Sequence, residues 1–311
     1  MIRGGLVFAT HHHHHHHHRQ HIISCLFLRR MTTKTYDLNK NTHAVAVGMP
    51  MGSSPIHDEL AELDEKTILN ALPLNKLQKP STGKPPLVLI LCGAFSPITN
   101  MHLRLFEEAR NYLMYDQHRY DVIGGFISPV NNEYPKESLV SGEHRLEMCR
   151  RAVETSSWIN VAPWEVEQSR WVRTAVVLSK YHNLLNDNRD HNQPIHVKLL
   201  CGADFMKSFL TPNLWRPDHL EAILGRFGLS CIERPIGLLS PHQFIHDHDC
   251  LWEHRNNIDI IPPSVENNVS SSAIRRLCNR GQSIKFLVPD SVLSYIEQHK
   301  LYDREKKVKE S

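Results

Sequence analysis

Gly93 and His102 are the first residues whose types and spacing suggest chemistry, and both lie in the stretch Cys92-Gly-Ala-Phe-Ser-Pro-Ile-Thr-Asn-Met-His102. The aliphatic residues 87–91 before it are typical of a strand buried on both faces. A glycine lets a ligand approach the backbone, and the apolar spacing predicts a helix over residues 100–115. The free N–H groups that begin such a helix attract anions. The pattern therefore predicts a phosphate-binding strand, turn and helix, with an ordinary connection and a surface histidine as the alternative.

A second stretch, Ser270-Ser-Ser-Ala-Ile-Arg-Arg276, predicts the beginning of another helix over residues 271–280. Each of its hydroxyl groups can accept a hydrogen bond from the free N–H groups of the first turn. Two arginines follow one turn later, so this helix begins with hydroxyls and positive charge. That chemistry suits a polyanion, and the simpler alternative is a capped helix whose basic face contacts only solvent.

Two tryptophans, Trp164 and Trp171, lie seven positions apart in a segment with apolar helical spacing. We expect a helix over residues 165–181, beginning near Trp164, on which both indoles share a face. Indole rings stack well on a flat, cationic ring. The pair therefore suggests a binding site for such a ring, with core or interface packing as the alternative for each tryptophan.

Strand and helix patterns alternate from residue 87 onward. The predicted strands cover residues 87–91, 122–127, 159–161, 195–200, 228–232 and 258–261. The predicted helices cover residues 100–115, 142–155, 165–181, 217–227, 271–280 and 290–299. This alternation predicts an α/β fold, a doubly wound parallel sheet with right-handed crossovers.

Two of the predicted strands end in the same sequence, Leu-Cys-Gly-Ala, at residues 91–94 and 200–203. In open α/β sheets, ligands bind in the crevice outside the carboxyl ends of the strands. We therefore expect the site between the turns that contain Gly93 and Gly202.

Three parts are expected along the 311 residues. Residues 1–85 are interpreted as a low-complexity, disordered N-terminal extension with a short helix at residues 56–72. Its histidine tract, residues 11–18, is a tag or a natural sequence that binds nickel or zinc, and we assign it no function. A folded domain is expected over residues 86–303, followed by a basic tail over residues 304–311.

Composition excludes several classes of protein. A formal net charge of +3, with scattered basic residues, predicts no nucleic-acid partner. Seven cysteines without a C-x-x-C pair argue against a disulfide framework or a cysteine zinc site and favour a reducing compartment. No apolar run approaches the roughly 20 residues that cross a bilayer, so no membrane partner is expected. We expect an intracellular protein of the nucleus, the cytoplasm or both.

Taken together, the string G-x-F-x-P-x-T-x-x-H of the first stretch and the serine-rich second stretch resemble the two signatures of the HxGH-type nucleotidyltransferases. The particular residues of these motifs resemble those of the eukaryotic nicotinamide mononucleotide adenylyltransferases, and the resemblance covers roughly residues 87–302. The resemblance implies a Rossmann-like nucleotidyltransferase fold and an enzyme of NAD biosynthesis. Its expected reaction transfers the adenylyl group of ATP to nicotinamide mononucleotide, and to the nicotinic acid form, and releases pyrophosphate.

The resemblance also implies roles for individual residues. His102 and Arg275 are the expected catalytic groups, as donors to the phosphates. The implied ATP-binding residues are Gly93, Ala94, Phe95, His102, Asn267, Ser272, Ile274 and Arg275. The implied mononucleotide-binding residues are Phe95, Lys136, Trp171, Thr174, Gly202, Asp204, Leu214, Trp215 and Arg234. Within this set, Trp171 and Trp215 are expected to clamp the nicotinamide ring, which leaves Trp164 a structural role.

Mg²⁺ is the expected cofactor, held mainly by the ATP phosphates, so no residue is assigned as a metal ligand. The resemblance also implies a homo-oligomer. Two alternatives stay open: an adenylyltransferase of the same superfamily that acts on a pantetheine phosphate or another small phosphate, and a catalytically silent, chaperone-like binding protein. Trp171 and Trp215 argue against the first alternative, and His102 with Arg275 argues against the second.

Overall fold

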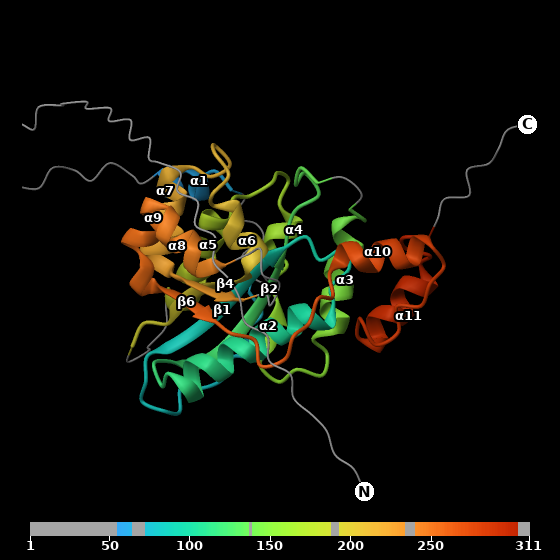
Figure 1. Ribbon diagram of the computed structural model, residues 1–311, viewed down its shortest axis with the longest axis horizontal. Helices are drawn as coiled ribbons and strands as arrows, with labels where there is room; N and C mark the ends of the chain where they lie inside the picture. The colour runs from blue at the N-terminus through green and yellow to red at the C-terminus, as the bar shows by residue number, and fades with distance from the viewer. Residues whose placement is uncertain (1–54, 64–71, 137–138, 188–192, 234–239, 304–311) are drawn as a thin grey trace, which may run out of the picture. The chain divides into compact units, whose positions relative to one another are not determined.

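Six parallel strands form one sheet in the computed structural model, which describes residues 55–63, 72–136, 139–187, 193–233 and 240–303 (Figure 1). The strands are β1 Pro86–Gly93, β2 Asp121–Pro129, β3 Ile159–Val161, β4 His196–Gly202, β5 Leu229–Ile232 and β6 Ile258–Ile261. Their order across the sheet is β3-β2-β1-β4-β5-β6, and every neighbouring pair is parallel. The predicted doubly wound α/β fold is confirmed, and each observed strand overlaps a predicted one.

Helices connect the strands, as Figure 1 shows. The α-helices are α1 Pro55–Ala61, α2 Asn100–Asn111, α3 Gly142–Ala152, α4 Trp164–Glu167, α5 Thr174–Asn186, α6 Ala203–Ser208, α7 Pro217–Glu221, α8 Pro241–Asp247, α9 Asp249–Glu253, α10 Ser271–Asn279 and α11 Asp290–Gln298. The π-helical turns η2 Tyr112–Asp116 and η3 Ala222–Phe227 continue α2 and α7, and the 3-10 turn η4 Arg255–Asn257 follows α9. Helices α8 and α9 were not predicted, because each is too short to show a clear period.

The sheet separates two hydrophobic clusters, and the alternation of side chains along β1 shows why. Val88 and Ile90 belong to one cluster, together with the apolar residues of α5, η3 and α9. Leu87 and Leu89 belong to the other cluster, with those of α2, α3 and α11. Because successive side chains of a strand point to opposite faces, an unbroken aliphatic run fits a sheet covered on both sides.

The predicted helix over residues 165–181 is wrong, because the structure has two helices there. Helix α4 ends at Glu167, and Gln168 has an extended backbone with ψ of 151°. The buried Gln168 side chain donates to the backbone carbonyl of Trp164 at 2.9 Å. The backbone carbonyl of Gln168 accepts a hydrogen bond from the side chain of Asn131. These contacts hold a loop in place of a helix. Trp164 is therefore buried and Trp171 is 37% exposed, so the two indoles do not share a helix face.

Parts of the predicted N-terminal extension contact the folded domain. Ile56 of α1 and Leu72 are buried in the cluster that contains α5, and Glu59 of α1 pairs with Arg216 at 2.5 Å. Nζ of Lys76 donates to the carbonyl of Val153 at 2.7 Å. Burial of these apolar side chains fixes residues that composition alone assigns to an extension. Residues 1–54 and 64–71 of the extension, which include the histidine tract, and the basic tail over residues 304–311 lie outside the described residues. None of the described helices has the length and apolar character that crossing a membrane requires.

Candidate active site

The strand order reverses between β1 and β4, and both strands end in a glycine at this point. Ile90 pairs with Leu199, so Gly93 and Gly202 follow at the same edge of the sheet. A cavity of about 270 Å³, called the site cavity below, opens there. It is lined by Leu91, Cys92, Gly93, Phe95, Met101, His102, Leu105, Lys136, Cys201, Gly202, Asp204, Phe205, Ile232, Glu233, Val269, Ser270, Ser271 and Ser272. This cavity lies where the sequence predicts the site, between the two Leu-Cys-Gly-Ala turns.

The turn after β1 depends on Gly93 and on the unusual backbone of Phe95. Phe95 has a φ of 46°, in the left-handed region, and its ring folds back toward the end of the strand. A Cβ atom at Gly93 would lie 3.1 Å from that ring, so the glycine leaves room for it. Nη1 of the fully buried Arg145 donates to the carbonyl of Ala94 at 3.1 Å and fixes the turn from α3.

His102 takes part in a reciprocal capping arrangement at the start of α2. Its Nδ1 accepts the backbone N–H of Thr99 at 3.0 Å and lies 2.9 Å from the Thr99 hydroxyl. An imidazole that accepts at Nδ1 carries its hydrogen on Nε2, because the partner of one ring nitrogen sets the tautomer. The ring packs edge-on against Phe95, with 5.2 Å between ring centroids. His102 therefore carries its hydrogen on Nε2, and the residue lines the site cavity.

The start of α10 docks on the turn that precedes α2. Ser270 caps α10 by accepting from the N–H of Ala273 at 3.2 Å. The Ser271 hydroxyl donates to the carbonyl of Pro97 at 2.8 Å, and Nη1 of Arg275 donates to the carbonyl of Ser96 at 2.8 Å. Two helix N-termini thus face one cavity, and both carry partial positive charge.

Arg275 lies beside the site cavity, in contact with a residue that lines it. Its Nη2 donates to the hydroxyl of Ser272 at 3.3 Å. Lys136 lines the cavity, and its pKa is lowered first by burial and then by the positive charge of Arg275. Because the positive charges of Lys136 and Arg275 repel each other, an anion bound between them is favoured.

The opposite wall comes from the ends of β4 and β5. Gly202 precedes α6, and Asp204 lies in the first turn of that helix. Phe205 and Glu233 also line the cavity and were not predicted. The signal for Glu233 was present, because it is a polar residue directly after a buried strand at the carboxyl edge.

Several residues implied by the resemblance lie outside the lining. Trp215 packs on Phe205 and Phe209, with centroids 5.5 and 5.0 Å away, and its Nε1 donates to Ser208 at 3.1 Å. Trp215 therefore adjoins the cavity through Phe205. Trp171 instead packs edge-on against Tyr134, with 5.7 Å between centroids.

The remaining implied residues have varied surroundings. Thr174 begins α5, and Leu214 is 53% exposed. Asn267 accepts from the N–H of Val269 at 2.9 Å, and Ile274 is fully buried behind the start of α10. Arg234 lies outside the described residues.

A buried carboxyl group, Glu165 of α4, lies next to Ser128 of β2 and was not predicted. Glu165 accepts from the Ser128 hydroxyl at 2.5 Å, and that hydroxyl also lies 3.0 Å from the Tyr181 hydroxyl. Burial raises the pKa of Glu165 to about 8, although the hydrogen bond from Ser128 and the charge of Arg145 act in the opposite direction. No sequence pattern distinguishes this carboxyl from an exposed one.

The sheet order and the cavity at its switch point define a doubly wound α/β protein, a class in which ligands bind at this edge of the sheet. The cytidylyltransferase-like family matches residues 90–277, more than half of the chain. Nicotinamide/nicotinic acid mononucleotide adenylyltransferase 1 of Bos taurus is 40% identical over 260 residues, 72% of this chain and 92% of the relative.

A plant protein and a yeast protein with the same activity in their names are also similar to this chain. The Arabidopsis thaliana nicotinamide/nicotinic acid mononucleotide adenylyltransferase is 41% identical over 234 residues, 74% of this chain and 97% of the relative. Nicotinamide/nicotinic acid mononucleotide adenylyltransferase 2 of Saccharomyces cerevisiae is 39% identical over 235 residues, 73% of this chain and 58% of the relative. The chain belongs to the nicotinamide/nicotinic acid mononucleotide adenylyltransferase family.

Proposed function

We propose that this chain transfers the adenylyl group of ATP to nicotinamide mononucleotide and to nicotinic acid mononucleotide. The 5′-phosphate of the mononucleotide attacks the α-phosphorus of ATP, the bond to the β-phosphate oxygen breaks, and pyrophosphate leaves. The products are NAD or deamido-NAD and pyrophosphate. Such a reaction needs alignment and charge neutralisation rather than a nucleophilic side chain.

The observation that carries this proposal is the convergence of the starts of α2 and α10 on one cavity. The hydrogen bond from Arg275 to the Ser96 carbonyl joins the two openings directly. The partial positive charges of both helices, together with Lys136 and Arg275, suit two phosphorylated substrates that must approach each other.

In this proposal, His102 and Arg275 donate hydrogen bonds to the phosphates as negative charge moves toward the leaving pyrophosphate. Nε2 of His102 is the donor, because Nδ1 is engaged with Thr99. The guanidinium of Arg275 is already oriented by Ser96 and Ser272. Donors oriented before the reaction need no rearrangement when charge develops.

The mononucleotide is proposed to bind toward β4 and α6. Gly202 leaves open space beside the backbone, since nothing lies within 4 Å of an added Cβ. Asp204 offers acceptors to ribose hydroxyls. Trp215 is the better-supported stacking residue for the pyridine ring, because it packs on Phe205 of the cavity wall. Trp171 completes the clamp only if its loop moves toward the cavity.

Mg²⁺ fits the proposed site by donor chemistry. Asp204 and Glu233 line the cavity and offer the oxygen donors that this ion prefers. The ion binds mainly through the nucleotide phosphates and neutralises part of their charge. We assign no residue as a direct ligand.

We further propose that the protein assembles as a homo-oligomer and works in the nucleus, the cytoplasm or both. Light scattering of the purified chain measures its assembly. Imaging of the labelled protein in cells gives its compartment.

The experiment that tests the function mixes the purified chain with ATP, Mg²⁺ and nicotinamide mononucleotide and detects NAD through alcohol dehydrogenase. NAD formation that requires all three components supports the proposal. A parallel reaction with a pantetheine phosphate tests the first alternative substrate. Absence of NAD above background, with a correctly folded protein, would reject the proposal and favour a silent binding protein.

A further inference from the structure

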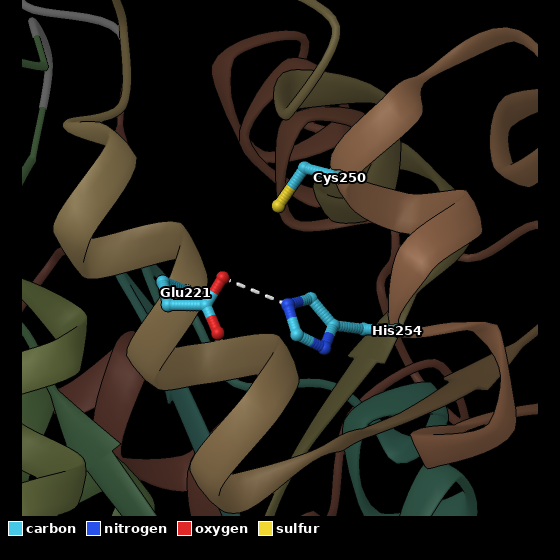
Figure 2. Close-up of side chains that lie close together, drawn as sticks. All are labelled: Glu221, Cys250 and His254. Carbon is cyan, nitrogen blue, oxygen red and sulfur yellow. Dashed lines mark hydrogen bonds and ion pairs between the residues drawn. The ribbon is translucent and has the colours of Figure 1, made fainter. Parts of the chain in front are cut away.

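Helices α7 and α9 bring one carboxylate, one thiol and one imidazole together, and none of the three lines the site cavity (Figure 2). Oε2 of Glu221 lies 2.8 Å from Nε2 of His254. The ligand atoms of Glu221, Cys250 and His254 all lie within 4.8 Å of one another. Figure 2 shows the Cys250 sulfur directed toward the space beside the carboxylate and the ring. Among the described residues, this is the one such group of three.

Packing outside the group fixes the two elements that carry it. Cys250 and His254 are four residues apart on α9 and its cap, which places them on one side of the helix. The Asn257 side chain donates to the carbonyls of Leu224 at 2.8 Å and Gly225 at 3.2 Å. The segment after α9 is thereby tied to η3, directly after Glu221. These bonds hold the backbone segments that carry the three donors next to each other, in addition to the contact between Glu221 and His254.

Gly225, one turn after Glu221, keeps the space between the helices open. A Cβ atom there would lie 2.9 Å from Oε1 of Glu221 and 3.0 Å from Cε1 of His254. Any larger residue would displace the carboxylate, the imidazole or both. The glycine thus leaves the two groups free to share a ligand.

We propose that Glu221, Cys250 and His254 form a Zn²⁺ site that fastens α9 to α7. Thiolate, imidazole and carboxylate are the ligand types that this ion takes, and three protein ligands leave a fourth position for water. Tetrahedral zinc needs donor atoms roughly 3.5 Å apart. Because Oε2 of Glu221 and Nε2 of His254 lie 2.8 Å apart, binding exchanges their hydrogen bond for two bonds to the ion and separates the two atoms slightly. Rotation of the Glu221 and Cys250 side chains, whose ligand atoms lie within 4.8 Å of one another, brings the thiolate to the same spacing.

The charges balance at such a site. One carboxylate and one thiolate carry two negative charges, which a divalent cation neutralises. The thiol of Cys250 loses its proton on binding, and the hydrogen of His254 moves from Nε2 to Nδ1. One proton is therefore released for each ion bound. Cysteine spacing alone does not reveal this site, because only one of its ligands is a cysteine.

Co²⁺ in place of Zn²⁺ provides a selective test, because thiolate ligation produces a near-ultraviolet charge-transfer band. The histidine tract also offers imidazoles to Co²⁺, and a band that depends on Cys250 distinguishes the proposed site from that tract. We expect Co²⁺, added in excess of what the histidine tract takes up, to generate the band in the full chain. The variant Cys250→Ser abolishes it, and Cys278→Ser, which changes another half-buried cysteine, retains it.

Two further variants, Glu221→Gln and His254→Gln, test the proposal even if Cys250→Ser does not fold. Glu221 is 62% exposed, so Glu221→Gln preserves the fold, as circular dichroism can verify. We expect Glu221→Gln and His254→Gln to weaken Co²⁺ binding on the order of tenfold or more. Added Zn²⁺ should raise the melting temperature of the full chain more than that of either variant. A missing band, or unchanged affinity in both variants, would overturn the proposal.

Discussion

Nη1 of Arg275 donates to the carbonyl oxygen of Ser96 at 2.8 Å, and this bond joins α10 to the turn between β1 and α2. The two residues are far apart in the sequence. The bond brings the second helix opening against the first, so that both face one cavity. Arg275 therefore has a structural contact as well as its proposed contact with phosphate, and experiments must separate the two.

Replacing Arg275 with alanine should reduce kcat/KM by about 10²–10³, because a preorganised donor to the transition state is lost. The variant Arg276→Ala is the matched control, since it removes an exposed arginine from the next position of the same helix. We expect the control to retain activity within about threefold, well below the effect of losing a transition-state donor. Equal melting temperatures with a large loss of turnover would separate the phosphate contact from the Ser96 contact. A change of less than threefold in Arg275→Ala would remove this residue from the mechanism.

His102→Ala should also lower turnover by about 10²–10³, through loss of the Nε2 donor. This variant additionally removes the acceptor for the Thr99 N–H, which costs about 1 kcal/mol of stability at a helix start. Thr99→Ala is the control, because it removes the hydroxyl partner and keeps the imidazole. Steady-state kinetics and thermal unfolding of both variants test the assignment. Comparable turnover losses in the two would mean that His102 acts only through the helix cap.

Trp215→Ala should raise KM for the mononucleotide on the order of tenfold and leave KM for ATP nearly unchanged, because stacking on the pyridine ring is lost. Trp252→Ala, which removes a half-exposed indole on α9, is expected to change neither constant. Equal effects on both substrates in Trp215→Ala would instead indicate general loosening of the Phe205 and Phe209 packing.

The stability of the protein should depend on pH through Glu165. Burial raises the pKa of this carboxyl to about 8, so the folded state keeps a proton that the unfolded state loses at lower pH. The contribution of this group to the free energy of unfolding is therefore highest in acid. It falls as the pH rises from the ordinary pKa range of a glutamate toward 8. Glu165→Gln should flatten that slope, as urea unfolding at several pH values can measure. An unchanged slope in the variant would contradict the buried, protonated state.

Much of the architecture could be predicted from local pattern. Short segments rich in apolar residues located the six strands of the described residues, because strands buried on both faces are mostly apolar. The repeated Leu-Cys-Gly-Ala placed the ends of β1 and β4 at one edge. The same reasoning failed at Gln168. There, a hydrogen bond from the distant Asn131 side chain, and one from the Gln168 side chain to the Trp164 carbonyl, hold a loop where the local spacing favours a helix.

The sequence by itself determined the parallel sheet, its carboxyl edge and the types of residue that are proposed to contact phosphate, because these depend on local periodicity and on short motifs. Only the tertiary structure decided that Arg275 reaches Ser96, that Glu165 is buried, and that Glu221 faces His254 across two helices. Such contacts join residues far apart in the chain. Their formation depends on how whole elements pack, which no local pattern records.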